Sequence, residues 1–129
     1  MKIYLDFDGT VVEHKYPKIG RAVPGWLQVV KKLLEAGHPV LLNTYRADMC
    51  NGSLLSAVEY LSDVGISVNA RVQKKHPPVW DWHLMRETGE IYIDDSAADM
   101  PLTTGEDGGK VVDWQRVHLE FIENGIYED

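Results

Sequence analysis

Cysteine is nearly absent from this sequence, in which Cys50 is the only one. A single thiol excludes any disulfide within the chain, and a reducing cytoplasm is the simplest compartment for such a sequence. Long apolar runs are absent as well, since none approaches the roughly 20 residues that a membrane-spanning helix needs. Asp6 and Asp8 also interrupt the apolar start too early for a signal peptide. We therefore expect a cytoplasmic protein without membrane contact.

Positive charge is in deficit. Lys and Arg together number 13, against 20 Asp and Glu, which gives a formal net charge of −7. Because nucleic-acid binding depends largely on neutralising phosphates, this balance argues against a nucleic-acid partner. Repeats, low-complexity segments and linkers are missing too. The length of 129 residues predicts a single domain over residues 1–129.

The sequence does contain an alternation of short apolar runs and amphipathic segments. The apolar runs predict strands over residues 2–7, 38–45, 66–72 and 91–93. The helical spacing of apolar residues predicts helices over 24–36, 53–64, 77–85 and 113–123. Two segments with glycine or proline, 11–23 and 101–110, are expected to be an irregular excursion and a polar loop.

Strands that alternate with helices favour a parallel sheet covered by helices. We therefore predict an α/β fold, in which a three-layer, Rossmann-like parallel sheet has helices on both faces. In such folds, ligands bind beyond the carboxyl ends of the strands.

The most informative motif is Asp-Phe-Asp-Gly-Thr at residues 6–10, directly after the first apolar run. Asp6 and Asp8 stand one residue apart at the end of a predicted strand, so we expect them to point the same way, because side chains alternate along a strand. Gly9 permits a sharp turn, in which Thr10 can hydrogen-bond. Two like charges this close repel unless a cation or a shared proton relieves them. The motif therefore suits a divalent metal, or a nucleophile beside a proton donor.

Further oxygen ligands follow other predicted strands. Thr44 ends the second strand, and Asp94 and Asp95 end the fourth. The carboxyl ends of parallel strands meet at one edge of a sheet, so these side chains should converge with Asp6 and Asp8. Carboxylate and hydroxyl oxygens suit a hard cation such as Mg²⁺.

This constellation resembles the haloacid-dehalogenase-like (HAD) superfamily of phosphotransferases. Its first motif matches residues 6–10, its second matches the apolar run that ends at Thr44, and its fourth matches Ile-Tyr-Ile-Asp-Asp at 91–95. The resemblance extends to about residue 100. The spacing between the motifs leaves no room for the cap domain that many members carry, so the resemblance implies a small capless member. A short segment, residues 13–21, would then act as a flap.

The resemblance also implies a mechanism and a role for each motif residue. Asp6 would be the nucleophile that attacks phosphorus, and Asp8 the general acid and base. Mg²⁺ would be held by Asp6, by the backbone carbonyl of Asp8 and by Asp94, with Asp95 assisting through water or by orienting the ligands. Thr44 and one cation would hold the phosphoryl oxygens.

The cation of the third motif is open between Lys74 or Lys75 and Arg86. The two lysines lie near the start of the predicted helix before the fourth strand, where the family usually places this residue. The implied activity is a Mg²⁺-dependent phosphatase acting on a phosphorylated substrate that the sequence does not identify. Closure of the open site by a second copy of the chain is compatible with this reading.

Other chemistry-bearing residues receive plainer interpretations. We expect Arg46 to form a surface ion pair rather than to reach the cleft. The five histidines lack metal-ligand spacing, so we expect none of them to bind a metal. Trp80 and Trp82 are expected in the core or at a subunit contact.

Two alternatives differ in class from a phosphatase. One is a regulatory module that binds Mg²⁺ and phosphate without turnover. The other is a phosphate-accepting receiver domain, in which the acceptor Asp lies on a middle strand and the acidic pair on the first. Here the order is reversed, with Asp6 and Asp8 on the first strand and paired acids on the fourth, which disfavours the receiver domain.

Overall fold

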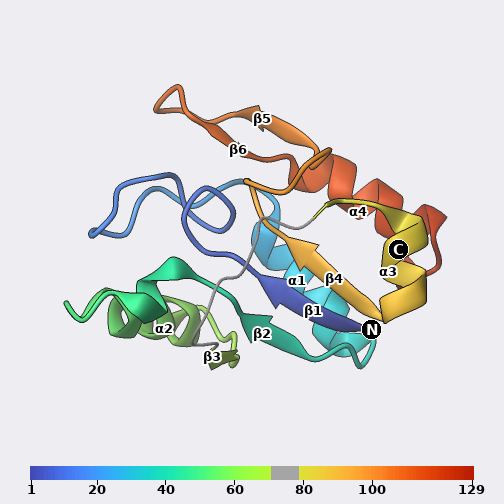
Figure 1. Ribbon diagram of the computed structural model, residues 1–129, viewed down its shortest axis with the longest axis horizontal. Helices are drawn as coiled ribbons and strands as arrows, with labels where there is room; N and C mark the ends of the chain where they lie inside the picture. Colours follow the sequence, from blue (N-terminus) through green and yellow to red (C-terminus); the bar gives the residue numbers. More distant parts are fainter. Residues whose placement is uncertain (71–78) are drawn as a thin grey trace.

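The computed structural model describes residues 1–70 and 79–129 (Figure 1). Its elements alternate as the sequence predicts, up to the hairpin near the carboxyl terminus. In chain order they are β1 (Lys2–Leu5), α1 (Trp26–Glu35), β2 (Val40–Leu42), the short 3₁₀ helix η1 (Tyr45–Asp48), α2 (Ser53–Asp63), β3 (Asn69–Ala70), α3 (Trp82–Thr88), β4 (Glu90–Ile93), β5 (Leu102–Thr104), β6 (Lys110–Val112) and α4 (Trp114–Glu123).

A small parallel sheet forms the centre of the molecule. Its strand order is β3-β2-β1-β4, and every neighbouring pair is parallel. Ile3 on β1 is level with Val40 on β2 and Ile91 on β4. This confirms an α/β fold with a parallel sheet, and it places β1 between β2 and β4, with the first motif directly after it.

The first two strands are shorter than the sequence predicts. The apolar pattern suggested residues 2–7 and 38–45, whereas β1 ends at Leu5 and β2 at Leu42. Single backbone bonds continue the pairing for one step, from Asn43 N to Leu5 O (2.8 Å) and from Asp6 N to Ile93 O (3.0 Å). The polar residues that follow these bonds belong to the loops at the carboxyl edge of the sheet.

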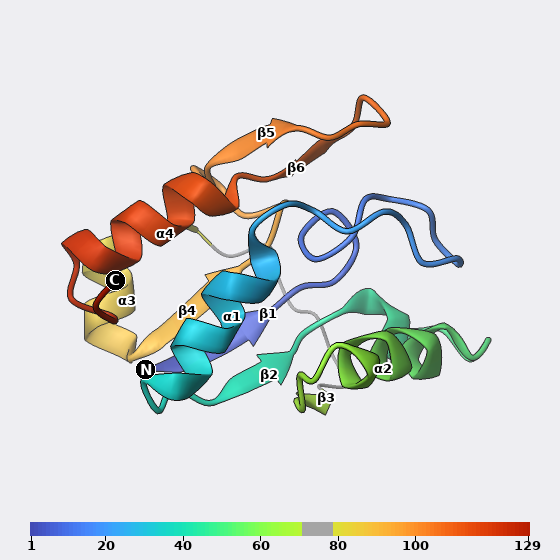
Figure 2. The same cartoon turned by 180° about the vertical axis from the view of Figure 1, so that it is seen from behind.

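Helix α1 covers one face of the sheet, and in Figure 2 it lies in front of β1. Its buried side chains, Trp26, Val29, Val30 and Leu33, recur at helical spacing. The helix ends at the predicted place, where Gly37 has a φ of 88°. Helix α4 packs beside α1 and buries Trp114, Val117 and Phe121.

The two tryptophans before and in α3 pack against α4. Trp80 is buried and its ring lies 6.0 Å from that of Phe121. The indole N–H groups of Trp80 and Trp82 both donate to Glu120 Oε1, at 3.1 and 2.9 Å. The expected core position is therefore confirmed for Trp80.

Residues 101–110 are not the polar loop that the sequence suggested. Strands β5 and β6 pair antiparallel, with Thr103 level with Val111. β-Branched residues favour this extended pairing, and Gly108, with a φ of 87°, supplies the turn. The polar composition and three glycines hid the hairpin, in which Val111 and Val112 are the only buried residues.

The hairpin is attached to the loop of the first motif. Val112 N donates to Gly9 O at 3.0 Å, and Trp114 Nε1 donates to Thr10 O at 2.7 Å. The flap, residues 13–21, lies beyond the carboxyl edge of the sheet, between the hairpin and α2 in both views (Figures 1 and 2). Within the ranges 1–70 and 79–129, no helix combines the length and apolar character that crossing a bilayer requires.

The Trp114 indole contact gives a test of how the motif loop is held. Trp114 is 1% exposed, so Trp114→Phe leaves the buried Thr10 carbonyl without this donor. We expect a loss of about 1–3 kcal/mol in the free energy of unfolding, measured by denaturant titration. The control is Leu119→Ala on the same helix, where the side chain is 46% exposed and the change should stay within about 0.5 kcal/mol. Equal stability of Trp114→Phe and the wild type would contradict this role.

Candidate active site

The predicted site residues follow three neighbouring strands at the carboxyl edge of the sheet. Asp6 follows β1, Thr44 follows β2, and Asp94 and Asp95 follow β4. Because β1 lies between β2 and β4, Asp6 is central, with Thr44 on one side and the acidic pair on the other. The parallel topology therefore produces the convergence that the sequence predicted.

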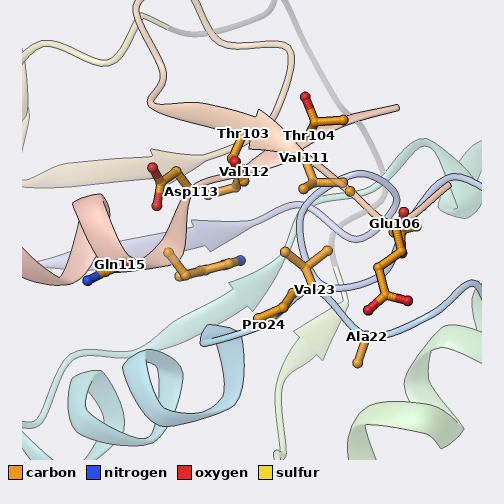
Figure 3. Close-up of a pocket in the computed structure, with 13 residues that line it drawn as sticks. Ala22, Val23, Pro24, Thr103, Thr104, Glu106, Val111, Val112, Asp113 and Gln115 are labelled. Atoms are coloured by element: carbon orange, nitrogen blue, oxygen red, sulfur yellow. The ribbon is translucent and has the colours of Figure 1, made fainter. Parts of the chain in front are cut away.

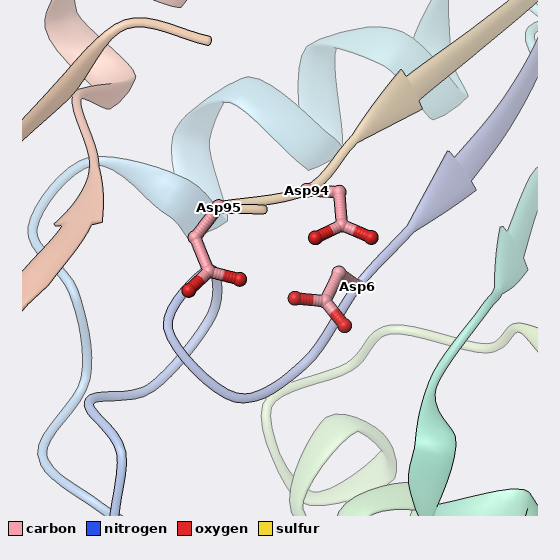
Figure 4. A group of neighbouring side chains, drawn as sticks. All are labelled: Asp6, Asp94 and Asp95. Atoms are coloured by element: carbon pink, nitrogen blue, oxygen red, sulfur yellow. The ribbon is translucent and has the colours of Figure 1, made fainter. Parts of the chain in front are cut away.

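Three carboxylates face one another at this edge (Figure 4). One oxygen from each of Asp6, Asp94 and Asp95 lies within 4.8 Å of the other two. Asp6 and Asp94 are each 1% exposed, and Asp95 is half-buried. Buried like charges at this separation repel strongly unless a cation or a proton offsets them. An all-oxygen set of this kind fits Mg²⁺, which prefers carboxylate and water ligands.

Short polar side chains orient these carboxylates. Thr10 Oγ1 donates to Asp6 Oδ2 at 3.0 Å and accepts from Asp95 N at 3.2 Å, so it links the two acidic segments. The backbone N–H and the hydroxyl of Ser96 both donate to Asp94 Oδ1, at 2.9 and 2.7 Å. The sequence indicated a turn role for Thr10, but not its bridge to β4.

Gly9 is required by both backbone and space. Its φ of 83° lies in the left-handed region that other residues rarely adopt. A Cβ at this position would collide with Asp95 Oδ2 and His14 Nε2. The glycine thus lets the motif loop pass close to the side chain of Asp95.

Asp8 has a different partner from Asp6. Its two carboxylate oxygens accept from Arg46, Oδ2 from Nε and Oδ1 from Nη2, each at 2.7 Å. Its side chain is not part of the three-carboxylate group, because β1 ends at Leu5 and strand alternation no longer sets the direction. The metal contact expected of Asp8 was through its backbone carbonyl, and that contact stays a prediction.

The expectation of a surface ion pair for Arg46 is wrong. Arg46 is 0% exposed, as is the side chain of Asp8 with which it pairs. Arg46 follows Thr44, whose buried hydroxyl accepts from Arg46 N at 3.2 Å and so caps the start of η1. This turn carries the arginine from the edge of β2 back toward the first motif.

Tyr45 is half-buried near Asp8 and Asp6. Burial, and then the negative charge of Asp8, raise the pKa of Tyr45 to about 12. The phenol therefore stays neutral at physiological pH and adds no charge to the site.

His14, from the flap, is a contact that sequence reasoning missed. Its Nε2 lies 2.9 Å from Asp95 Oδ2, although the ring itself is exposed. A histidine four residues after the Asp-x-Asp-Gly-Thr motif was the available signal, but only the fold of the flap brings it to β4. The flap thereby contacts both acidic segments, at Asp95 through His14 and at Asp8 through Arg46.

The structure describes one of the three candidates for the third motif. Lys74 and Lys75 lie outside the described residues. Arg86 is exposed in the last turn of α3, and its Nη1 donates to Asn124 Oδ1 at 2.9 Å. It lies before the amino end of β4, whereas Asp94 follows the carboxyl end, so Arg86 is not brought to the three carboxylates.

A separate hollow lies on the hairpin side of the motif loop (Figure 3). It has a volume of about 350 Å³ and lies between the hairpin and residues 22–24. Its wall includes Glu13, Glu106 and Trp114, but none of the three clustered aspartates. It is therefore distinct from the acidic site.

Comparisons with known proteins give a fold relationship. No family model and no curated protein matches this chain. A solved structure of a conserved protein from Bacteroides thetaiotaomicron is similar, with a TM-score of 0.61 and 26% sequence identity. The match covers 97% of this chain and 91% of that one. That protein is described only as conserved, so the similarity concerns the fold and indicates no activity.

The acidic cluster predicts a measurable metal affinity. Asp94→Asn removes one of the three carboxylates, and we expect Mg²⁺ binding, followed by titration calorimetry, to weaken by about tenfold or more. Asp63→Asn is the matched control, because it removes the same charge from an exposed position at the end of α2. Equal Mg²⁺ affinity in the two variants would show that the cluster is not the metal site.

Proposed function

We propose that this protein is a Mg²⁺-dependent phosphohydrolase of the HAD type, acting on a phosphomonoester through an aspartyl-phosphate at Asp6. The observation that carries the proposal is the meeting of Asp6 with Asp94 and Asp95 at the carboxyl ends of adjacent parallel strands. The sequences at 6–10 and 91–95 match the first and last motifs of that superfamily. On this proposal the small sheet and its helices are a reduced, three-layer Rossmann-like core without a cap domain.

Asp6 is suited to be the nucleophile. It is buried at the centre of the edge, and Thr10 fixes its carboxylate through Oδ2. Mg²⁺, when bound by Asp6, Asp94 and Asp95, supplies positive charge that offsets the repulsion between a carboxylate and an anionic phosphate. Asp6 attacks phosphorus, and the bond from phosphorus to the leaving oxygen breaks as the new bond forms.

Asp8 is suited to move the proton. In the first step it gives a proton to the leaving oxygen, and in the second it takes one from the water that hydrolyses the aspartyl-phosphate. Thr44, and Lys74 or Lys75, would hold the phosphoryl oxygens as negative charge develops on them.

One observation favours a second candidate. Both oxygens of Asp8 are occupied by Arg46, which is also how a purely structural ion pair would look. A module that binds Mg²⁺ and phosphate without turnover would keep the three clustered aspartates and use Asp8 only for folding. Binding of inorganic phosphate with Mg²⁺, but no hydrolysis of any phosphomonoester, would identify that module.

The nucleophile has a direct test. Asp6→Asn should reduce Mg²⁺-dependent release of phosphate from 4-nitrophenyl phosphate to background, because the amide is a poor nucleophile. The assay is colorimetric, and far-UV circular dichroism checks that the variant stays folded. Asp63→Asn, at an exposed position, should retain wild-type activity. A folded Asp6→Asn variant with full activity would refute the assignment.

The third-motif cation can be assigned by comparing Lys74→Ala, Lys75→Ala and Arg86→Ala. We expect one lysine variant to lose about 100-fold or more in kcat/KM, because a donor to the developing charge is removed. Arg86→Ala should stay near the wild type, since Arg86 bonds Asn124 away from the acids. A large loss in Arg86→Ala together with two active lysine variants would reverse this assignment.

A further inference from the structure

Arg46 bonds not only Asp8 but also three backbone carbonyls, two of which belong to the flap. Its Nε and Nη2 donate to the two oxygens of Asp8, each at 2.7 Å. Nη1 donates to the carbonyls of Pro17 (3.2 Å) and Ser53 (3.1 Å), and Nη2 also donates to the carbonyl of Lys18 (2.8 Å). A guanidinium group has five N–H donors in a fixed plane, and here each has an acceptor.

Two aromatic rings lie near the same guanidinium. The Arg46 Cζ atom is 5.0 Å from the centre of the Phe7 ring and 5.3 Å from that of Tyr16. Phe7 belongs to the first motif, and Tyr16 to the flap. With the carbonyls of Pro17 and Lys18, this makes Arg46 a junction between the flap and the motif loop.

The pairing separates the two acids of the first motif. Asp6 faces Asp94 and Asp95, whereas Asp8 is held by Arg46. A bidentate arginine uses one lone pair on each carboxylate oxygen, and each oxygen has a second lone pair. Arg46 therefore fixes the plane and direction of the Asp8 carboxylate, and a second lone pair on each oxygen can still accept a proton.

We infer that Arg46 is a positioning residue: it aims Asp8 for proton transfer and makes that aim depend on the seated flap. The inference rests on the proposed function, because it concerns the acid and base of that reaction. Release of the flap would remove the carbonyls of Pro17 and Lys18 from Arg46, and with them part of what fixes the guanidinium against Asp8. The flap thus couples closure over the site to proton transfer.

The flap is also held at its base, where Glu13 contacts both Arg21 and the hairpin. Glu13 N donates to Arg21 O at 2.8 Å, closing the base of the flap. The buried Glu13 carboxylate accepts from Asp107 N, at the tip of the hairpin, at 2.9 Å. The base of the flap is therefore joined to the hairpin, and Arg46 joins the flap to Asp8.

The test depends on the leaving group. A phenolate that leaves easily, as from 4-nitrophenyl phosphate, needs little protonation, whereas unsubstituted phenyl phosphate needs more. With Mg²⁺ and the full chain, Arg46→Lys should lose about 10- to 100-fold more kcat/KM on phenyl phosphate than on 4-nitrophenyl phosphate, because kcat/KM reports the step in which the leaving group departs. Lysine keeps the charge, but it lacks the planar fork that holds both oxygens of Asp8.

Two further variants keep the test decisive. Tyr16→Leu removes the half-buried flap ring from Arg46, together with its contacts to Asn51 and Tyr45, so it should shift the same ratio in the same direction even if Arg46→Lys does not fold. Arg116→Lys is the control, because this exposed arginine pairs only with Glu120 on α4 among the described residues and should leave the ratio unchanged. The double variant Arg46→Lys/Asp8→Asn should be no more selective between the substrates than Asp8→Asn alone.

The outcomes separate the inference from the function it rests on. A loss of equal size on both substrates in Arg46→Lys and in Tyr16→Leu, or no loss in either, would overturn the positioning role while the wild type still hydrolyses both. A wild type without Mg²⁺-dependent hydrolysis of either substrate would contradict the proposed function, and the inference with it. A selective loss on phenyl phosphate supports both.

Discussion

Repulsion among Asp6, Asp94 and Asp95 is the constraint on which the rest of the site depends. Three carboxylate oxygens within 4.8 Å of one another, two of them from nearly inaccessible residues, oppose folding unless a positive charge joins them. The parallel sheet forces this meeting, because β1 and β4 are neighbours in register. A fold that accepts such a cost at the ligand-binding edge of its sheet is consistent with a cation site used for chemistry.

The loops around the edge serve to hold this arrangement. Gly9 lets the motif loop approach Asp95, and Thr10 bridges Asp6 to the β4 segment. The hairpin, bound to this loop through Val112 and Trp114, supports it from the other side. These small polar contacts hold the motif loop in place beside the three carboxylates.

Part of this organisation was readable from the sequence. Apolar runs that end in acids predicted the meeting of Asp6 with Asp94, because parallel topology decides which edge the acids share. The hairpin at 102–112 was missed, since its pairing is secured by contacts with the distant motif loop rather than by its own apolar content. The buried role of Arg46 was missed for a similar reason. Its acceptors include carbonyls of the flap, whose position no local pattern encodes.

On the proposed mechanism, Asp6 carries the phosphoryl group during turnover, and this intermediate can be trapped. Its most direct test is acid quenching of the wild-type protein during hydrolysis of 4-nitrophenyl phosphate with Mg²⁺, followed by peptide mapping by mass spectrometry. We expect one phosphoryl group on Asp6, lost on treatment with hydroxylamine as an acyl phosphate should be, and absent when Mg²⁺ is withheld. Turnover without a phosphorylated peptide, or with the phosphoryl group on another residue, would contradict it.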